Sequence, residues 1–196
     1  MTTIYQTKYL AFKSAKSPSG NDWFYVKRTN DSLSHDSAVV ITTLVKKENG
    51  YNFLLLKTSR PPLYAENKAK FCIESPAGLI ADEDKQENLN SCIKKELLEE
   101  AGYSADKIFI EMKNCSTSSG LSSETLTYVT AIVNYDKLNQ TPVDDGGIIV
   151  ERFFIQFDKI HEFLKQTKTE SISIASATVC GIYFAIERFK QIETDR

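Results

Sequence analysis

The carboxylates that crowd the end of one predicted helix are the residues of this 196-residue chain with the clearest chemical meaning. Glu96, Glu99 and Glu100 precede Gly102, which marks the end of that helix. A helix C-terminus carries partial negative charge, so each exposed carboxylate there is unfavourable by about 0.3–1 kcal/mol. Glu96 and Glu100 lie four residues apart on one face and repel each other unless a cation lies between them. The pattern favours a site for a hard divalent cation, Mg²⁺ or alternatively Mn²⁺, over a solvated acidic helix.

The helix that must position these carboxylates is predicted from about Glu87 to Ala101. At about 100° per residue, its apolar residues form one stripe that faces the protein core. The stripe consists of Leu89, Ile93, Leu97 and Ala101. Glu96 lies at the border of the stripe, and Glu100 projects between Leu89 and Ile93. A solvated acidic face would lie opposite the stripe, so the two glutamates are expected to face the protein.

Composition places the chain among ordinary globular domains. Hydrophobic residues make up 41% and charged residues 26% of the chain, which permits a sizeable core. The net charge of −2, without a basic block, gives no indication of nucleic-acid binding. There is no signal-peptide pattern and no apolar run of membrane-spanning length, so we expect a cytoplasmic protein without a membrane partner. The four cysteines form no Cys-x-x-Cys pair and are expected as free thiols, and His35 and His161 are isolated.

The order of predicted elements indicates an α+β, or mixed α/β, fold. Residues 1–36 are expected to form a small strand-rich extension, with residues 32–36 as a loop, and residues 37–196 the main domain. Strands are predicted at 5–13, 23–29, 38–46, 51–58, 71–74, 107–112, 126–134 and 148–155. Asn49-Gly50 is a hairpin signal between two of them. A long loop is expected around Pro61-Pro62, and further helices at 158–166 and 173–191.

The acidic helix, together with an upstream glycine, resembles the Nudix box. Gly78 is followed by Lys95-Glu96-Leu97-Leu98-Glu99-Glu100-Ala101-Gly102-Tyr103, which departs from the defined positions of the second half only where Lys95 replaces arginine. The segment between Gly78 and this run is three residues longer than in the usual Nudix box. Glu87, eight residues before Lys95, is taken as the first glutamate of the box in preference to Asp84.

Two further motifs resemble the ADP-sugar pyrophosphatase branch of the Nudix hydrolases. They are Ser59-Arg60-Pro61-Pro62-Leu63 and Cys72-Ile73-Glu74-Ser75-Pro76-Ala77-Gly78-Leu79-Ile80. Trp23–Thr29 and Gly147–Glu151 also resemble segments of that branch, so the likeness spans about residues 5–190. Ser119 stands where ADP-ribose hydrolases carry proline, and UDP-sugar hydrolases of the branch also tend to lack that proline.

The resemblance implies a mixed β-sheet between helices and a metal-dependent active site. It implies metal ligands at Glu96, Glu99, Glu100 and the carbonyl of Ala77. A general base is needed to activate water, and the candidates are Glu151 and Glu124, with Glu100 in the same catalytic group. The structural positions of the box are Gly78, Glu87, Lys95 and Gly102.

The same resemblance implies a set of substrate-binding residues. They are Arg60, Glu74, Trp23, Tyr9 and Arg28. Arg60 before two prolines suits bidentate binding of phosphate. Trp23 is expected to stack on a nucleobase, although a single tryptophan commonly packs in a core instead. The N-terminal strands are expected to form a homodimer in which Arg28 reaches the partner's site.

The activity implied is hydrolysis of a nucleoside diphosphate sugar to a nucleoside monophosphate and a sugar phosphate. ADP-ribose or another ADP-sugar is the favoured substrate, and UDP- or GDP-sugars are the alternatives. A non-catalytic nucleotide-binding regulator with the same fold is the rival from another class, although the intact Glu96, Glu99 and Glu100 argue against it. A nucleoside triphosphate sanitising enzyme is a third alternative, which the extension and Arg60-Pro61-Pro62 disfavour.

Overall fold

The structure, a computed structural model, describes residues 1–29, 37–81, 87–139, 141–142, 148–167 and 171–194. The loop predicted at residues 32–36, Asp84 and Gly147 lie outside the described residues.

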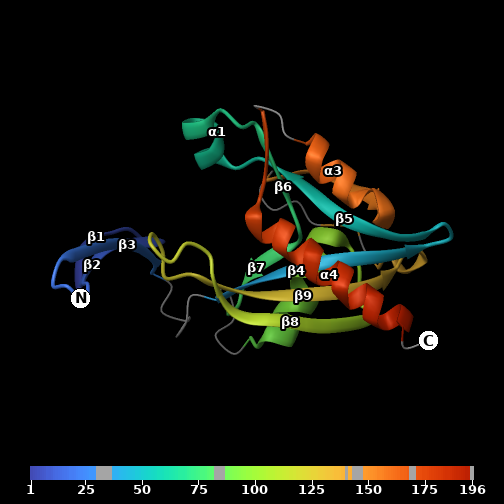
Figure 1. The fold of residues 1–196 in the computed structure, drawn as a ribbon, viewed down its shortest axis with the longest axis horizontal. Coiled ribbons are helices and arrows are strands. Elements are labelled where there is room, and N and C mark those ends of the chain that lie inside the picture. Colours follow the sequence, from blue (N-terminus) through green and yellow to red (C-terminus); the bar gives the residue numbers. More distant parts are fainter. Residues whose placement is uncertain (30–36, 82–86, 140, 143–147, 168–170, 195–196) are drawn as a thin grey trace.

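An eight-stranded mixed sheet forms the centre of the molecule (Figure 1). Its main path runs in the order β11-β6-β5-β4-β9-β8, while β10 pairs with β5 and β7 pairs with β4. The strands are β4 (Ser37–Lys47), β5 (Gly50–Thr58), β6 (Phe71–Glu74), β7 (Ala77–Leu79), β8 (Lys107–Ser116), β9 (Thr125–Asn134), β10 (Ile149–Gln156) and β11 (Ile172–Ile174). The predicted hairpin is confirmed, since β4 and β5 are antiparallel and Gly50 has a φ of 110° that favours glycine.

Helices cover both faces of this sheet. On one face lies α2 (Leu89–Glu96), continued by the turn η1 (Leu97–Ala101). On the other face lie α3 (Ile160–Gln166) and α4 (Ser176–Thr194). Short 3-10 turns follow β9 and β10, at η2 (Tyr135–Lys137) and η3 (Phe157–Lys159). This arrangement confirms the predicted mixed sheet sandwiched between helices.

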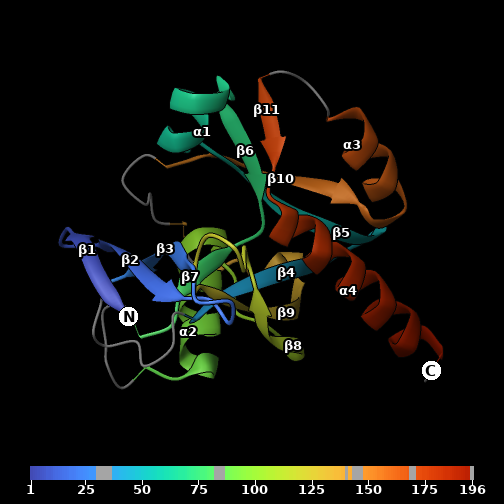
Figure 2. The same cartoon turned by 60° about the vertical axis from the view of Figure 1, so that its left-hand side comes forward.

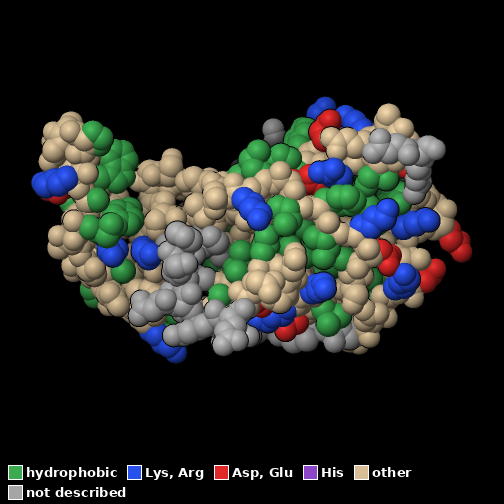
Figure 3. All heavy atoms as spheres, turned by 90° about the horizontal axis from the view of Figure 1, so that it is seen from below, with side chains coloured by type: hydrophobic (Ala, Val, Ile, Leu, Met, Phe, Trp, Pro, Cys, Tyr) green, Lys and Arg blue, Asp and Glu red, His purple; other side chains and the backbone are tan. Residues whose placement is uncertain are grey.

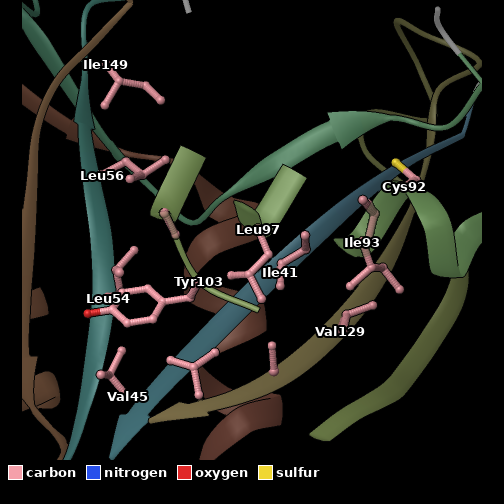
Figure 4. Close-up of a cluster of buried hydrophobic side chains, with 14 residues drawn as sticks. Ile41, Val45, Leu54, Leu56, Cys92, Ile93, Leu97, Tyr103, Val129 and Ile149 are labelled. Carbon is pink, nitrogen blue, oxygen red and sulfur yellow. The ribbon is translucent and has the colours of Figure 1, made fainter. Parts of the chain in front are cut away.

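The apolar stripe predicted for the acidic helix is confirmed as its buried face. Ile93 and Leu97 are fully buried against β4, β5 and β9, and Ala101 is buried with them (Figure 4). Burying each such leucine or isoleucine contributes roughly 1.5–3 kcal/mol. The helix that carries the carboxylates is therefore fixed on the sheet by its buried apolar residues. A second cluster joins the other sheet face to α3 and α4.

A separate three-stranded antiparallel sheet is formed by β1 (Thr2–Gln6), β2 (Leu10–Lys16) and β3 (Asp22–Arg28). It projects from the body of the molecule, beside the end where β7 lies (Figure 2). Strand β3 is tied to a loop of the main domain, because the Val26 N–H donates to the Leu121 carbonyl at 2.8 Å. The Ser123 N–H donates back to the Val26 carbonyl at 3.3 Å.

Several predicted elements differ in the structure, and four of these differences have an identifiable local cause. The strand expected at 5–13 is two strands, because the Thr7 hydroxyl accepts from the backbone N–H of Tyr9 and Leu10 and closes a turn. The loop at Pro61-Pro62 contains a short helix, α1 (Pro61–Asn67), since proline is favourable in a first helical turn.

The other two differences concern helix beginnings. The acidic helix begins at Leu89, where Asn88 and Ser91 form a reciprocal cap. The helix expected from Ser173 begins at Ser176, because Ile172–Ile174 pairs in parallel with β6 as β11.

Within the described part of the chain, every helix is too short or too polar to cross a lipid bilayer.

Candidate active site

The acidic helix ends in a π turn. Residues Leu97–Ala101 form this wider turn, and Gly102 follows in the left-handed region with a φ of 80°. The Gly102 N–H donates to the Leu98 carbonyl at 2.9 Å. The positive φ explains glycine at this position, as the helix-end prediction required. Single π turns occur frequently at functional sites, and no residue pattern in this sequence indicated one.

Two predicted metal ligands converge on the short strand β7. The carboxylate Oε2 of Glu100 accepts a hydrogen bond from the Ala77 N–H at 2.8 Å. Glu96 lies over Gly78, where a Cβ atom would come within 2.0 Å of the Glu96 Oε1. Glu96, Glu99 and Glu100 are all half-buried. The structure therefore brings Glu96 and Glu100 together with Ala77 and Gly78.

Two further box residues, Glu87 and Lys95, lie close enough to Cys92 of α2 to influence its thiol. Burial, and then the negative charges of Glu87 and Glu96, raise the pKa of the Cys92 thiol to about 12, while Lys95 lowers it. Glu87 also accepts a hydrogen bond from the Ala81 N–H at 2.9 Å. Ala81 has a φ of 60°, so this bond holds a left-handed residue in place. The structure thus places both Glu87 and Lys95 near Cys92, and a direct pairing of Glu87 with Lys95 stays a prediction.

Arg60 and Glu74 form a bidentate ion pair at the edge of the site. The Arg60 Nη2 lies 2.7 Å from Glu74 Oε2, and its Nε lies 3.1 Å from Oε1. The hydrogen bond with Glu74 raises the pKa of the Arg60 guanidinium; burial opposes this, and the charges of Glu74 and Glu100 add to it. Arg60 therefore lies within the electrostatic reach of Glu100.

Arg152 is a site residue that motif matching did not find. Its Nε donates a hydrogen bond to the backbone carbonyl of Glu100. Arg152 directly follows the candidate base Glu151 in the sequence, but the residue that it binds, Glu100, lies 52 positions earlier. Only the sheet register brings the two together.

Glu151 is not brought together with the helix glutamates. Successive strand residues point to opposite sheet faces, and Arg152 faces the acidic helix. Glu151 instead pairs with Lys57, with 3.7 Å between Oε2 and Nζ. Its side chain is 56% exposed. Any contact with the other glutamates would require rearrangement.

The remaining candidates lie where the three-stranded sheet meets the loop before β9. Trp23 is 53% exposed, and its indole Nε1 donates to the Gly120 carbonyl at 2.9 Å. Arg28 Nε lies 3.0 Å from Glu124 Oε1 in the same chain. A cavity of about 140 Å³ lies beside this pair. Tyr9 is exposed, and its carbonyl accepts from the Thr29 N–H at 3.0 Å, at the Arg28 end of the strands and away from Trp23.

The donor set fits a hard cation in its chemistry. The helix end offers three carboxylates, and the absence of a Cβ at Gly78 leaves the space that the Glu96 carboxylate fills. Among the described residues, no three Asp, Glu, His or Cys side chains converge closely enough to hold a metal as they stand. Glu100 is instead turned to the Ala77 N–H. Metal binding would therefore require these side chains to turn.

Comparison with known proteins identifies relatives of one kind. The chain matches no protein-family model. It is 30% identical over 155 residues to a Nudix hydrolase of Schizosaccharomyces pombe, covering 78% of this chain and 71% of that protein. It is 32% identical over 151 residues to the ADP-ribose pyrophosphatase of Saccharomyces cerevisiae, covering 74% of this chain and 62% of that protein.

A solved structure described as an ADP compounds hydrolase shares the fold. The TM-score is 0.70 at 16% sequence identity, with 97% of this chain and 91% of that chain covered. At this identity the likeness concerns the fold alone, and it confirms the predicted architecture.

Proposed function

The chain belongs to the Nudix hydrolase family, and from this premise we propose that it hydrolyses the pyrophosphate bond of a nucleoside diphosphate sugar. The products are a nucleoside monophosphate and a sugar phosphate. ADP-ribose or another ADP-sugar is the substrate that we favour, because the Saccharomyces relative is an ADP-ribose pyrophosphatase. The observation that carries the proposal is the convergence of Glu96 and Glu100 on the Ala77–Gly78 backbone.

The proposed metal ligands are Glu96, Glu99, Glu100 and the Ala77 carbonyl. A bound Mg²⁺ or Mn²⁺ supplies neutralisation of phosphate oxygens and a lower pKa for bound water. The protein's contribution is to hold the oxygen donors on two rigid elements, the helix end and β7. The hydrogen bond from the Ala77 N–H holds the Glu100 carboxylate on β7, next to the proposed carbonyl ligand, and a bound metal would draw the carboxylate away from this N–H.

For the general base we favour Glu124 over Glu151. Ala38 of β4 pairs with both Leu79 of β7 and Leu126 of β9, so Glu124 lies at the same end of the sheet as β7. Its ion pair with Arg28 orients the carboxylate. Glu151 lies on the opposite sheet face in a salt bridge with Lys57.

Substrate binding is assigned to residues on both sides of the site. The bidentate pair with Glu74 orients the Arg60 guanidinium, whose remaining N–H groups suit phosphate oxygens. The bond from Trp23 to Gly120 fixes the indole while half of its surface stays exposed for a base. Tyr9 is a weaker candidate, since it is exposed and lies away from this contact.

We also propose a homodimer formed through the three-stranded sheet. Its strand register places Tyr5, Leu10, Phe12 and Phe24 on one face. All four are exposed, and the rings of Phe12 and Phe24 stack at 5.8 Å. Figure 3 shows apolar side chains gathered on this projecting part of the molecule. We propose that the same face of a second copy of the chain packs against it. Arg28 also lies on this face, opposite Leu10.

The cysteines support a reducing, cytoplasmic location within this proposal. All four are free thiols, and Cys72 and Cys92 are buried.

A substrate panel tests the proposed function. The full-length protein is incubated with Mg²⁺ and ADP-ribose, ADP-glucose, UDP-glucose, GDP-mannose or ATP, with chelator as the control. We expect AMP and ribose 5-phosphate in equal amounts from ADP-ribose, and no product with chelator. Binding of ADP-ribose without release of AMP from any substrate would instead favour the regulator.

A further inference from the structure

One residue of the acidic helix joins two strands that lie far apart in the sequence. The carboxylate of Glu100 accepts from the Ala77 N–H of β7 at 2.8 Å. The backbone carbonyl of the same residue accepts from Arg152 Nε of β10. The π turn is therefore held from one strand through its side chain and from another through its backbone.

Arg152 also supplies a positive charge that the turn itself lacks. Lys94 and Lys95 lie in the last turn of α2, but the π turn that follows has no basic residue at its end. A helix C-terminus is partly negative, and here it also carries Glu99 and Glu100. A guanidinium bound to the Glu100 carbonyl offsets this charge where it is greatest.

The register of the sheet fixes the approach of Arg152. Arg152 pairs with Leu56 of β5, and Leu56 pairs in turn with Glu74 of β6. Cross-strand partners share a face, and Leu56 is buried in the core beneath α2. Arg152 and the Arg60–Glu74 pair therefore flank the helix end from two sides of the same sheet face. The neighbouring Glu151 and Lys57 point to the other face.

We propose that Arg152 is a positioning residue of the metal site. By binding the Glu100 carbonyl, it sets the orientation of the π turn and hence the direction in which Glu96, Glu99 and Glu100 present their oxygens. The inference rests on the proposed function for its catalytic consequence, but not for its effect on metal binding. Arg152 touches neither metal nor substrate in this assignment, so its effects pass through Glu100.

Three variants test this assignment. Arg152→Gln removes the charge, and Arg152→Lys keeps the charge but loses the planar guanidinium. Arg188→Gln is the matched control, because Arg188 makes a bidentate pair with Glu111 between α4 and β8, away from the acidic helix. Mn²⁺ binding is titrated by electron paramagnetic resonance without substrate, and kcat, KM for ADP-ribose and the thermal midpoint are measured on the same preparations.

We expect Arg152→Gln to weaken Mn²⁺ binding and to lower kcat by about 10- to 100-fold, as loss of groups behind metal ligands typically does. KM for ADP-ribose should change less than about twofold, because the substrate contacts remain. Arg152→Lys should fall between Arg152→Gln and the wild type. Arg188→Gln should lower the thermal midpoint and leave Mn²⁺ affinity unchanged.

Wild-type Mn²⁺ affinity in folded Arg152→Gln would overturn the assignment. If Arg152→Gln does not fold, Arg152→Lys decides, and unchanged Mn²⁺ affinity in that variant overturns it equally. If the wild type hydrolyses no nucleotide sugar, the Mn²⁺ titration still tests Arg152, so the two failures are distinguishable.

Discussion

At the scale of single residues, the site depends on a glycine at position 78, where a side chain would collide with Glu96. Gly78 has no Cβ, and the Cδ atom of Glu96 would lie 2.1 Å from one. The Nudix resemblance assigned Gly78 a structural role but gave no reason for it. The reason is the close approach of a helix side chain to the backbone of β7, which depends on tertiary packing and cannot be read from the sequence.

Gly78→Ala should therefore reduce activity more than stability. The added methyl group forces the Glu96 carboxylate from its position, and misplacement of a catalytic group by about 1 Å can lower the rate about 10²-fold. The thermal midpoint should change little, because a flexible side chain yields rather than the core. Full activity in Gly78→Ala would show that Glu96 does not act from this position.

Trp23→Ala should raise KM rather than alter stability. The ring is half exposed, so little apolar area is lost from the core. Base stacking contributes roughly 1–3 kcal/mol, which corresponds to a KM increase of about 5- to 150-fold. The kcat value should change less, because stacking is similar in the ground and transition states. KM and thermal midpoint are measured on one preparation, and unchanged KM would count against the stacking role.

At the scale of elements, the helices and strands that could be predicted are those with a local pattern of apolar residues. The stripe of Leu89, Ile93, Leu97 and Ala101 identified the acidic helix and its buried face. The π turn at its end has no such pattern, because contacts from Ala77 and Arg152 accompany it. The helix prediction over 173–191 includes Ser173 and Ile174 of β11, because this strand forms only by pairing with β6, about 100 residues earlier.

The packing of α4 on β4 predicts a second glycine effect of the opposite kind. A Cβ at Gly181 would lie 2.3 Å from the buried hydroxyl of Thr42. Overpacking costs typically 1–3 kcal/mol, against a gain in helix propensity of up to about 1 kcal/mol. Gly181→Ala should lower the thermal midpoint and leave kcat unchanged. The control Glu187→Ala, at an exposed position, should change neither the thermal midpoint nor kcat. An unchanged midpoint would show that Thr42 can yield.

At the scale of the whole molecule, an eight-stranded sheet has buried apolar clusters on both faces, and a separate three-stranded sheet projects beside it. Composition and strand patterns predicted the strand-rich extension, and its boundary near residue 36 stays a prediction. The tie between Arg28 and Glu124 joins residues 96 positions apart. No sequence pattern indicates this pairing, and the reach of Arg28 into a partner's site, which the family resemblance implies, stays a prediction.

The exposed apolar face of the projecting sheet predicts the oligomeric state. Phe24→Asp should convert the proposed dimer to a monomer, because burying an unpaired charge in an interface is costly. Phe24 is 52% exposed, so the chain itself should still fold. Lys13→Glu, on the opposite face of the same sheet, is the matched control and should stay dimeric. Light scattering after size-exclusion chromatography measures the mass, and a dimeric Phe24→Asp variant would contradict this interface.

Glu100 tests the central claim most directly, because it joins the helix end to β7. In Glu100→Gln the amide oxygen can still accept from the Ala77 N–H, so the fold should persist while the charge for a metal is lost. The measurement is Mg²⁺-dependent release of AMP from ADP-ribose by wild type and variant at matched thermal midpoints. We predict a decrease in kcat of at least about 10²-fold. Near-normal release of AMP by the folded variant would contradict a metal-dependent hydrolase centred on this helix end.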